Sequence, residues 1–179
     1  MISHIWLFFS ADVIPIASNN LLETIPNLYE EFDVAFDLYI NDGWGPNAWR
    51  SVLRLTNTDN DKDNFGDRLA MFMVNGELTK VLFTSAANPS PHVPYSHVTT
   101  VPHSRWIPIR IQQKVIEDRF KLIYWYDGTA VKEILMDRPR VYNNTKVLAG
   151  DRFKGALSGT LRNLTITTCK SLFVCKQST

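Results

Sequence analysis

The chain has 179 residues, 21% of them charged, and a formal net charge of +1. This length fits one domain that buries about 70% of the surface its unfolded chain exposes, so folding needs no metal or disulfide. The small net charge excludes a broad basic surface for nucleic acid, and no apolar run reaches the roughly 18 residues that span a bilayer.

Residues 1–18 allow two interpretations. Residues 5–9, with the sequence Ile-Trp-Leu-Phe-Phe, resemble the apolar part of a signal peptide. They lack a positive flank, however, and Asp12 interrupts the apolar run. We therefore favour an N-terminal strand of the domain over residues 5–16, ended by Pro15.

Alternation predicts a central strand over residues 31–40. Phe32, Phe36 and Ile40 fall on one face together with two further apolar residues, while Asp33 and Asp37 fall on the other. A strand produces this pattern because its side chains alternate between two faces. Each large apolar side chain stabilises the fold by roughly 1.5–3 kcal/mol when it is buried. A second sheet must therefore cover the apolar face.

Turn signals divide the rest of the chain into further strands. Asn75-Gly76 and Asp127-Gly128 are typical of two-residue hairpins with type I′ turns. Residues 86–104 contain four prolines and no period, which predicts a long loop. The other strands are expected at residues 21–25, 49–56, 69–74, 78–84, 106–112, 120–126, 131–135, 141–149 and 159–167. With no amphipathic helix, residues 1–168 are predicted to form one all-β domain, a two-sheet antiparallel β-sandwich or jelly roll.

The C-terminal tail, residues 169–179, contains both cysteines of the chain. Cys169 and Cys175 have five residues between them, and we predict a local disulfide, with two free thiols as the alternative. A disulfide indicates an oxidising compartment. Asn143 and Asn163 begin glycosylation sequons, which agrees with an extracellular location.

Five segments together resemble one fold family. They are residues 31–37 (EFDVAFD), 49–56 (WRSVLRLT), 66–68 (GDR), 106–111 (WIPIRI) and 161–166 (LRNLTI). Their pattern resembles the strands of concanavalin A-like lectin/glucanase domains, in particular the laminin G-like jelly roll. The resemblance covers about residues 20–167 and implies a two-sheet sandwich. Because the superfamily includes lectins, adhesive modules, glucanases and polysaccharide lyases, it implies no single activity.

The glucanases of this superfamily carry two carboxylates on one strand, because retaining hydrolysis needs them about 5–5.5 Å apart. Glu31 and Asp33 begin that motif here, but Ala35 and Phe36 stand where the second glutamate belongs. Asp37 lies one residue too far along the strand. We therefore predict no glycosidase, and in an enzyme Asp33 and Asp37 would be the first residues to test.

The alginate lyases of the superfamily carry an arginine-bearing strand and, elsewhere, a histidine base. Arg50 and Arg54 copy the arginine spacing, but Val52 replaces the acid and no Gln-Ile-His segment occurs. Without a base there is no β-elimination, so we predict no lyase. The two arginines remain candidates for an exposed sheet face that binds an acidic or hydroxyl-rich glycan. The alternative is surface pairing with Asp33 or Asp37 across neighbouring strands.

An acidic loop suggests the one cofactor that the sequence offers, Ca²⁺. Its carboxylates alternate as oxygen ligands do around a calcium ion. The candidate ligands are Asp59, Asp61, Asp63 and Asp67. Asn64 and Ala70 depart from the EF-hand pattern, and a solvated acidic turn is the alternative.

We expect an extracellular binding protein and not an enzyme. The leading hypothesis is carbohydrate recognition through rim loops at residues 42–48, 57–67 and 86–103 and through a shallow sheet face. The candidate ligand-binding residues are Trp44, Arg50, Arg54 and Arg68. The second hypothesis is a structural or adhesive module that binds extracellular protein and forms homo-oligomers through its edge strands. A polysaccharide-degrading enzyme is the third.

Overall fold

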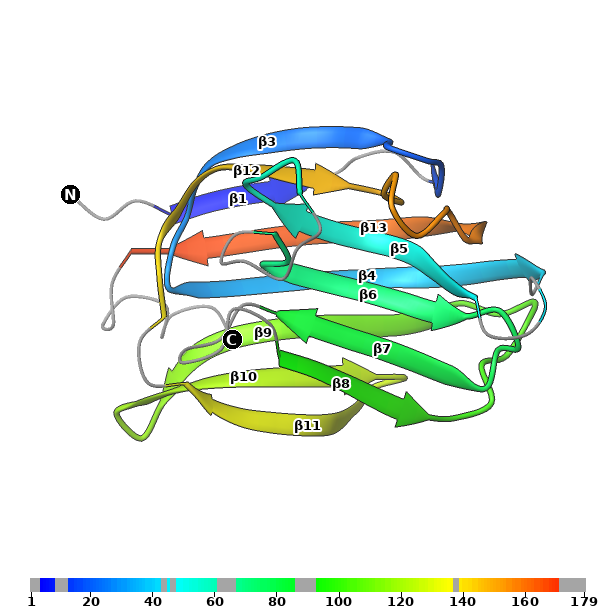
Figure 1. The fold of residues 1–179 in the computed structure, drawn as a ribbon. Coiled ribbons are helices and arrows are strands. Elements are labelled where there is room, and N and C mark those ends of the chain that lie inside the picture. The colour runs from blue at the N-terminus through cyan, green and yellow to red at the C-terminus, as the bar shows by residue number, and fades with distance from the viewer. Residues whose placement is uncertain are drawn as a thin grey trace.

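Two antiparallel β-sheets packed face to face form the molecule (Figure 1). The structure is a computed structural model that describes residues 4–8, 13–42, 45, 48–60, 67–85, 93–136 and 139–170. All regular elements in these residues are strands, which confirms the all-β prediction. Within the same residues, no helix has the length and apolar character to cross a membrane.

Sheet A has the strand order β1-β13-β4-β9-β10-β11, and β2 also pairs with β13. Its strands are β1 (His4–Phe8), β2 (Ile14–Pro15), β4 (Glu31–Asp42), β9 (Ile107–Ile116), β10 (Arg119–Tyr126), β11 (Thr129–Met136) and β13 (Ser158–Cys169). The first and last strands of the described chain, β1 and β13, are therefore neighbours, and β13 lies between β1 and β4.

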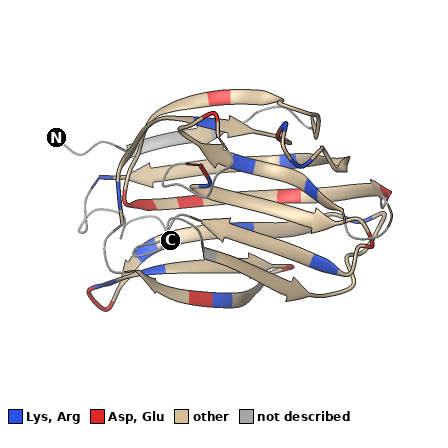
Figure 2. Ribbon diagram, viewed as in Figure 1, with Lys and Arg blue, Asp and Glu red and all other residues tan. Residues whose placement is uncertain are grey.

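Sheet B has the strand order β3-β12-β5-β6-β7-β8. Its strands are β3 (Leu21–Leu28), β5 (Trp49–Thr56), β6 (Ala70–Asn75), β7 (Lys80–Ser85), β8 (Val93–Val98) and β12 (Tyr142–Leu148). Charged residues of both signs are interspersed over the strands and loops (Figure 2).

The central strand has the predicted alternation. In β4, Phe32, Val34, Phe36, Leu38 and Ile40 are buried in the core between the sheets. The strand pairs with β13 on one side and β9 on the other, so it lies inside sheet A. Its apolar face meets sheet B, as the two-layer prediction requires.

A row of aromatic rings connects the two sheets through the core. The ring of Phe36 in β4 packs edge-on against Phe72 in β6, with centroids 6.0 Å apart. Phe72 contacts Phe83 in β7 at 4.9 Å, and Phe83 stacks on Tyr124 in β10 at 4.9 Å. Offset-stacked and edge-to-face pairs are the arrangements that aromatic rings prefer. The row therefore joins sheet A to sheet B at two points.

The two predicted hairpins exist, but only one has the predicted turn. Asp127 and Gly128 both have positive φ, as a type I′ turn requires. Between β6 and β7 the type I′ prediction is wrong, because the connection has four residues and Leu78 adopts positive φ there. The Asn75 Oδ1 accepts hydrogen bonds from the backbone N–H groups of Thr79 and Lys80, at 2.9 and 2.7 Å. This side-chain cap stabilises the longer turn.

Two predicted segments are corrected by the structure. Residues 86–104 are not one loop, because β8 occupies Val93–Val98 and pairs with β7. Pro94 is compatible with this strand because β8 is at the edge of sheet B, where a missing N–H is tolerated. The single strand predicted over residues 5–16 is two short strands, β1 and β2, that both pair with β13.

Because two tyrosines are buried, we expect the stability of the fold to depend on pH in the alkaline range. Burial raises the pKa of Tyr126 to about 12 and that of Tyr124 well above its usual range. A tyrosine whose folded pKa exceeds its unfolded value of about 10 stabilises the fold fully below pH 10, and this contribution is lost as pH rises through the folded pKa. We expect the denaturant midpoint to fall between about pH 10 and 12. Tyr126→Phe should reduce this dependence without abolishing it, because Tyr124 remains, and an unchanged wild-type midpoint up to pH 12 would contradict the expectation.

Candidate functional site

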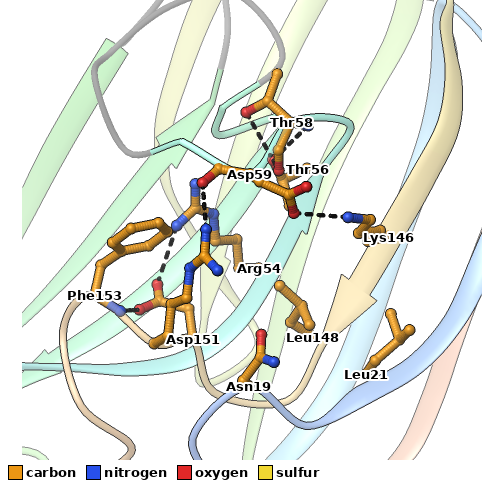
Figure 3. A pocket seen from close by; sticks show the side chains of 11 residues that line it. Asn19, Leu21, Arg54, Thr56, Thr58, Asp59, Lys146, Leu148, Asp151 and Phe153 are labelled. Carbon is orange, nitrogen blue, oxygen red and sulfur yellow. Dashed lines mark hydrogen bonds and ion pairs between the residues drawn. The ribbon is translucent and has the colours of Figure 1, made fainter.

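A pocket of about 150 Å³ lies on sheet B over β12, β5 and the beginning of β3 (Figure 3). A water molecule needs roughly 10–15 Å³ of such volume, so the pocket has room for several waters or for a small polar group. Its lining combines cationic, anionic, hydroxyl and apolar side chains. The lining residues are Asn19, Leu21, Arg54, Thr56, Thr58, Asp59, Lys146, Leu148, Asp151, Arg152 and Phe153.

The register between β12 and β5 determines which residues form the floor of the pocket. In the β12–β5 pair, Lys146 lies opposite Thr56 and Leu148 lies opposite Arg54. Their neighbours Val147 and Leu55 belong to the core between the sheets. Because successive side chains of a strand point to opposite faces, the four pocket residues are on the outer face of sheet B.

The buried side chain of Arg54 forms part of the floor of the pocket. It is only 1% exposed, and its Nε and Nη2 donate to the backbone oxygen of Asp67 at 3.0 and 2.7 Å. Nη2 also donates to the backbone oxygen of Asn60 at 2.5 Å, and Nη1 lies 3.5 Å from the Asp151 carboxylate. One guanidinium therefore joins two chain segments, at residues 60 and 67, to the loop after β12.

The loop after β12 is held in one conformation by a close contact at Gly150 and by the side chain of Asp151. Gly150 has φ +88, and a Cβ built there would lie 2.5 Å from the Ala17 carbonyl oxygen. The Asp151 Oδ1 accepts hydrogen bonds from the N–H groups of Phe153 and Lys154, at 2.7 and 2.9 Å. This arrangement fixes the pocket wall before a ligand arrives, which lowers the entropy cost of binding.

Charged groups meet at the exposed side of the pocket. The Lys146 Nζ donates to the Asp59 carboxylate at 2.7 Å, and the Arg152 Nη2 donates to the Asp59 carbonyl oxygen at 2.6 Å. The hydrogen bond and positive charge of Lys146 lower the pKa of Asp59. Phe153 is 42% exposed, and the guanidinium groups of Arg54 and Arg152 lie 5.1 and 4.8 Å from its ring centroid.

The predicted ligand-binding residues do not form the exposed face that the sequence suggested. Arg54 lines the pocket but is buried, so the expectation of an exposed arginine is wrong. Arg68 is also buried. Arg50 is half-buried and reaches over Gly155, whose added Cβ would lie 2.6 Å from its Nη1. Trp44 lies outside the described residues, and the roles of all four in binding stay predictions.

Pairing of Arg50 or Arg54 with the aspartates of β4 is also wrong, because β5 belongs to the other sheet. Asp33 instead accepts a hydrogen bond from the Nε of Arg110 at 2.8 Å. Asp37 accepts one from the Nε of Arg162 at 3.0 Å. These pairs join adjacent strands of sheet A. Cross-strand pairing of the two aspartates with arginines was therefore predicted, but the partners are Arg110 and Arg162.

Asp33 and Asp37 do not form the carboxylate pair of a glycosidase. They lie four residues apart on one strand, which separates their Cα atoms by about 13 Å at 3.3–3.4 Å per residue. Retaining glycosidases need carboxyl groups about 5–5.5 Å apart, and inverting ones about 6.5–9.5 Å. Each aspartate is also paired with an arginine.

The predicted calcium ligands are only partly within the described residues. Asp61 and Asp63 lie outside them. The Asp67 carboxylate is buried and accepts a hydrogen bond from the Thr58 hydroxyl, while Asp59 pairs with Lys146. No cluster of three or more metal-ligating side chains occurs in the described part of the chain. Calcium binding stays a prediction.

The covalent modifications also stay predictions. Cys169 is buried at the end of β13, and Cys175 lies outside the described residues. Both sequon asparagines are exposed. The Asn163 Nδ2 donates to the Asp37 carboxylate at 2.8 Å, whereas Asn143 lies in β12.

Sequence reasoning missed the residues that make the pocket most distinctive, Lys146, Arg152 and Phe153. Lys146 belongs to a strand with no ligand-binding motif, and its place in the pocket follows from the pairing of β12 with β5. The segment Gly150-Asp151-Arg152-Phe153 carried a local signal, because Gly-Asp is typical of turns and an arginine next to an aromatic residue suits a binding loop.

Comparison with known proteins identifies the fold. No protein-family model and no curated protein matches the sequence. Among solved structures, the heptameric SAP-like pentraxin from Limulus polyphemus has a TM-score of 0.56 and 12% identity, covering 87% of this chain and 75% of that chain. The Ruminococcus gnavus IT-sialidase CBM40 bound to α2,3-sialyllactose has a TM-score of 0.54 and 9% identity, covering 84% and 89%.

An enzyme shares the same architecture. The alginate lyase vAL-1 from Chlorella virus has a TM-score of 0.54 and 6% identity, and the match covers 78% of this chain and 71% of that chain. These identities are too low to transfer an activity, but the similarities confirm the concanavalin A-like jelly-roll fold.

Proposed function

We propose that this protein is an extracellular carbohydrate-binding module and that the pocket on sheet B is its glycan site. The observation that carries the proposal is the exposed ring of Phe153 beside a pocket rich in hydrogen-bonding groups. The similarity to the R. gnavus CBM40, solved with a bound glycan, supports it. The cysteines and sequons of the sequence support the extracellular setting.

The chemistry of the pocket suits a sugar. A sugar ring has an apolar face of C–H groups and a rim of hydroxyls, so it binds where an aromatic ring stands beside donors and acceptors. Phe153 provides the aromatic ring. Thr58, Asn19 and Lys146 provide polar groups around the cavity. The fixed loop conformation means that few side chains must be ordered on binding.

Glycan-array screening tests the proposal directly. We expect the wild type to bind a defined set of glycans and Phe153→Ala to lose about two- to twelvefold in affinity for them, because an aromatic contact contributes roughly 0.5–1.5 kcal/mol beyond the area it buries. Leu135→Ala is the matched control, since Leu135 is 54% exposed on sheet A, away from the pocket. Equal loss in both variants, or no binding by the wild type, would refute the proposed site.

A structural module that self-associates is the second candidate. Val98 is 73% exposed on β8, and Leu135 is exposed on β11. Each of these strands is one edge of its sheet, and edge strands with apolar side chains can pair with another chain. Concentration-dependent self-association without glycan binding, measured by sedimentation, would favour this candidate over the first.

A further inference from the structure

We infer that the glycan held in the pocket carries an anionic group, a carboxylate or a sulfate ester, and that Arg152 binds this group. The inference rests on the proposed function and goes further by naming the class of sugar and the residue that selects it. It predicts a preference that a pocket built only for hydroxyl groups would not have.

The charges that line the pocket do not cancel. Arg54 and Asp151 form a pair in which each side chain is 1% exposed, so this pair is sealed from solvent. Lys146 pairs with the Asp59 carboxylate at 2.7 Å. Arg152 then adds a positive charge. Among the described residues that line the pocket, three are cations and two are carboxylates, which leaves a net charge of +1.

Arg152 is exposed and held in place while most of its donors remain available. One nitrogen, Nη2, donates to the Asp59 carbonyl oxygen, and the guanidinium packs on the Phe153 ring. Among the described residues, no carboxylate forms an ion pair with Arg152, whose hydrogen bond to Asp59 is to the backbone oxygen. A guanidinium has five N–H donors in a rigid plane and binds a carboxylate or sulfate through two of them. An anion can therefore bind Arg152 without breaking the contacts that orient it.

The position of Arg152 connects the anion contact to sugar stacking. The Arg152 guanidinium lies 4.8 Å from the centroid of the Phe153 ring, and Phe153, which is 42% exposed, provides the aromatic surface of the site. A sugar that contacts Phe153 would bring a substituent on its ring within reach of the neighbouring guanidinium. Lys146, which pairs with the Asp59 carboxylate, provides a second cation in the same pocket.

Asp59 limits how strongly an anion binds, and this allows a variant that should gain affinity. Its carboxylate is 74% exposed and faces Lys146. Arg152 also interacts with it electrostatically. Asp59→Asn removes the repulsive charge and keeps an oxygen that accepts the Lys146 hydrogen bond. We expect anionic glycans to bind this variant about three- to tenfold more tightly.

Matched ligand pairs test the inference by calorimetry at low salt. The pairs are α2,3-sialyllactose and lactose, a uronate oligosaccharide and its carboxyl-reduced form, and a sulfated polysaccharide and its desulfated form. We expect the acidic member of at least one pair to bind about tenfold or more tightly, with the first two pairs reporting a carboxylate and the third a sulfate ester. The preference should weaken as salt is raised.

Arg152→Met should abolish the preference, so that the acidic and neutral members of each pair bind with equal affinity. Arg105→Met is the control for net charge, because Arg105 is exposed and pairs with Asp127 at the β10–β11 turn of the other sheet. Equal affinity for both members of every pair would overturn the inference while leaving the proposed glycan site standing. No binding of any glycan would overturn both, and an acidic preference that survives Arg152→Met would overturn the role of Arg152.

Discussion

Arg54→Met should destabilise the protein by about 3–5 kcal/mol, more than any other single change at the pocket. Removing one partner of a buried ion pair leaves an uncompensated charge, and here the Asp151 carboxylate would remain 1% exposed without its cation. The backbone oxygens of Asn60 and Asp67 would also lose their donor. Chemical denaturation followed by tryptophan fluorescence gives the free energy of unfolding directly.

Two further variants separate the ion pair from simple loss of packing. Arg54→Met combined with Asp151→Asn should be less destabilised than the sum of the single changes, because Asn removes the stranded charge and retains an oxygen for the N–H groups of Phe153 and Lys154. Arg119→Met, at an exposed position, should change stability by less than about 0.5 kcal/mol. Additivity of the two single changes would show that Arg54 and Asp151 are not coupled.

Reduced glycan binding in an Arg54 variant would therefore report on folding as much as on recognition. The side chain is inaccessible, and it fixes the segments at residues 60 and 67 that border the pocket. Arg152 is exposed and donates one hydrogen bond within the protein, to the Asp59 backbone oxygen. Its substitution therefore reports on recognition more directly.

Local alternation was sufficient to predict the strand that organises the fold. The period-two pattern of β4 depends only on the chemistry of successive residues, and a wholly apolar face needs a covering layer wherever the chain folds. The same logic predicted β10, whose Leu122, Tyr124 and Tyr126 are in the core. Fold class was therefore accessible from sequence alone.

Strand β5 shows where alternation fails. A register shift between Ser51 and Leu53 places both Val52 and Leu53 in the core, although strict alternation would place them on opposite faces. A bulge adds one residue to a strand and has no strong sequence signal. Alternation also gives the face of Arg54 but not its exposure, because the loop that covers it comes about 100 positions later in the chain.

The pocket depends on contacts between segments that are distant in sequence. Lys146 and Asp59 are 87 positions apart, and Arg152 and Asp59 are 93 apart. No local sequence motif predicts these contacts, because they are created by the pairing of β12 with β5. Rim loops were predicted as the binding region in general terms, and the particular residues required the sheet topology.

Phe83→Ala should destabilise the protein by about 3–5 kcal/mol, because truncating a buried phenylalanine removes its transfer free energy and leaves a cavity. The ring is fully buried and contacts Phe72 in its own sheet and Tyr124 in the other, both at 4.9 Å. Phe83→Leu should cost less, since most of the volume is retained. Phe153→Ala is the matched control, and its exposed ring should contribute less than about 1 kcal/mol to folding. A Phe83→Ala midpoint within error of the control would mean that the aromatic row does not hold the two sheets together.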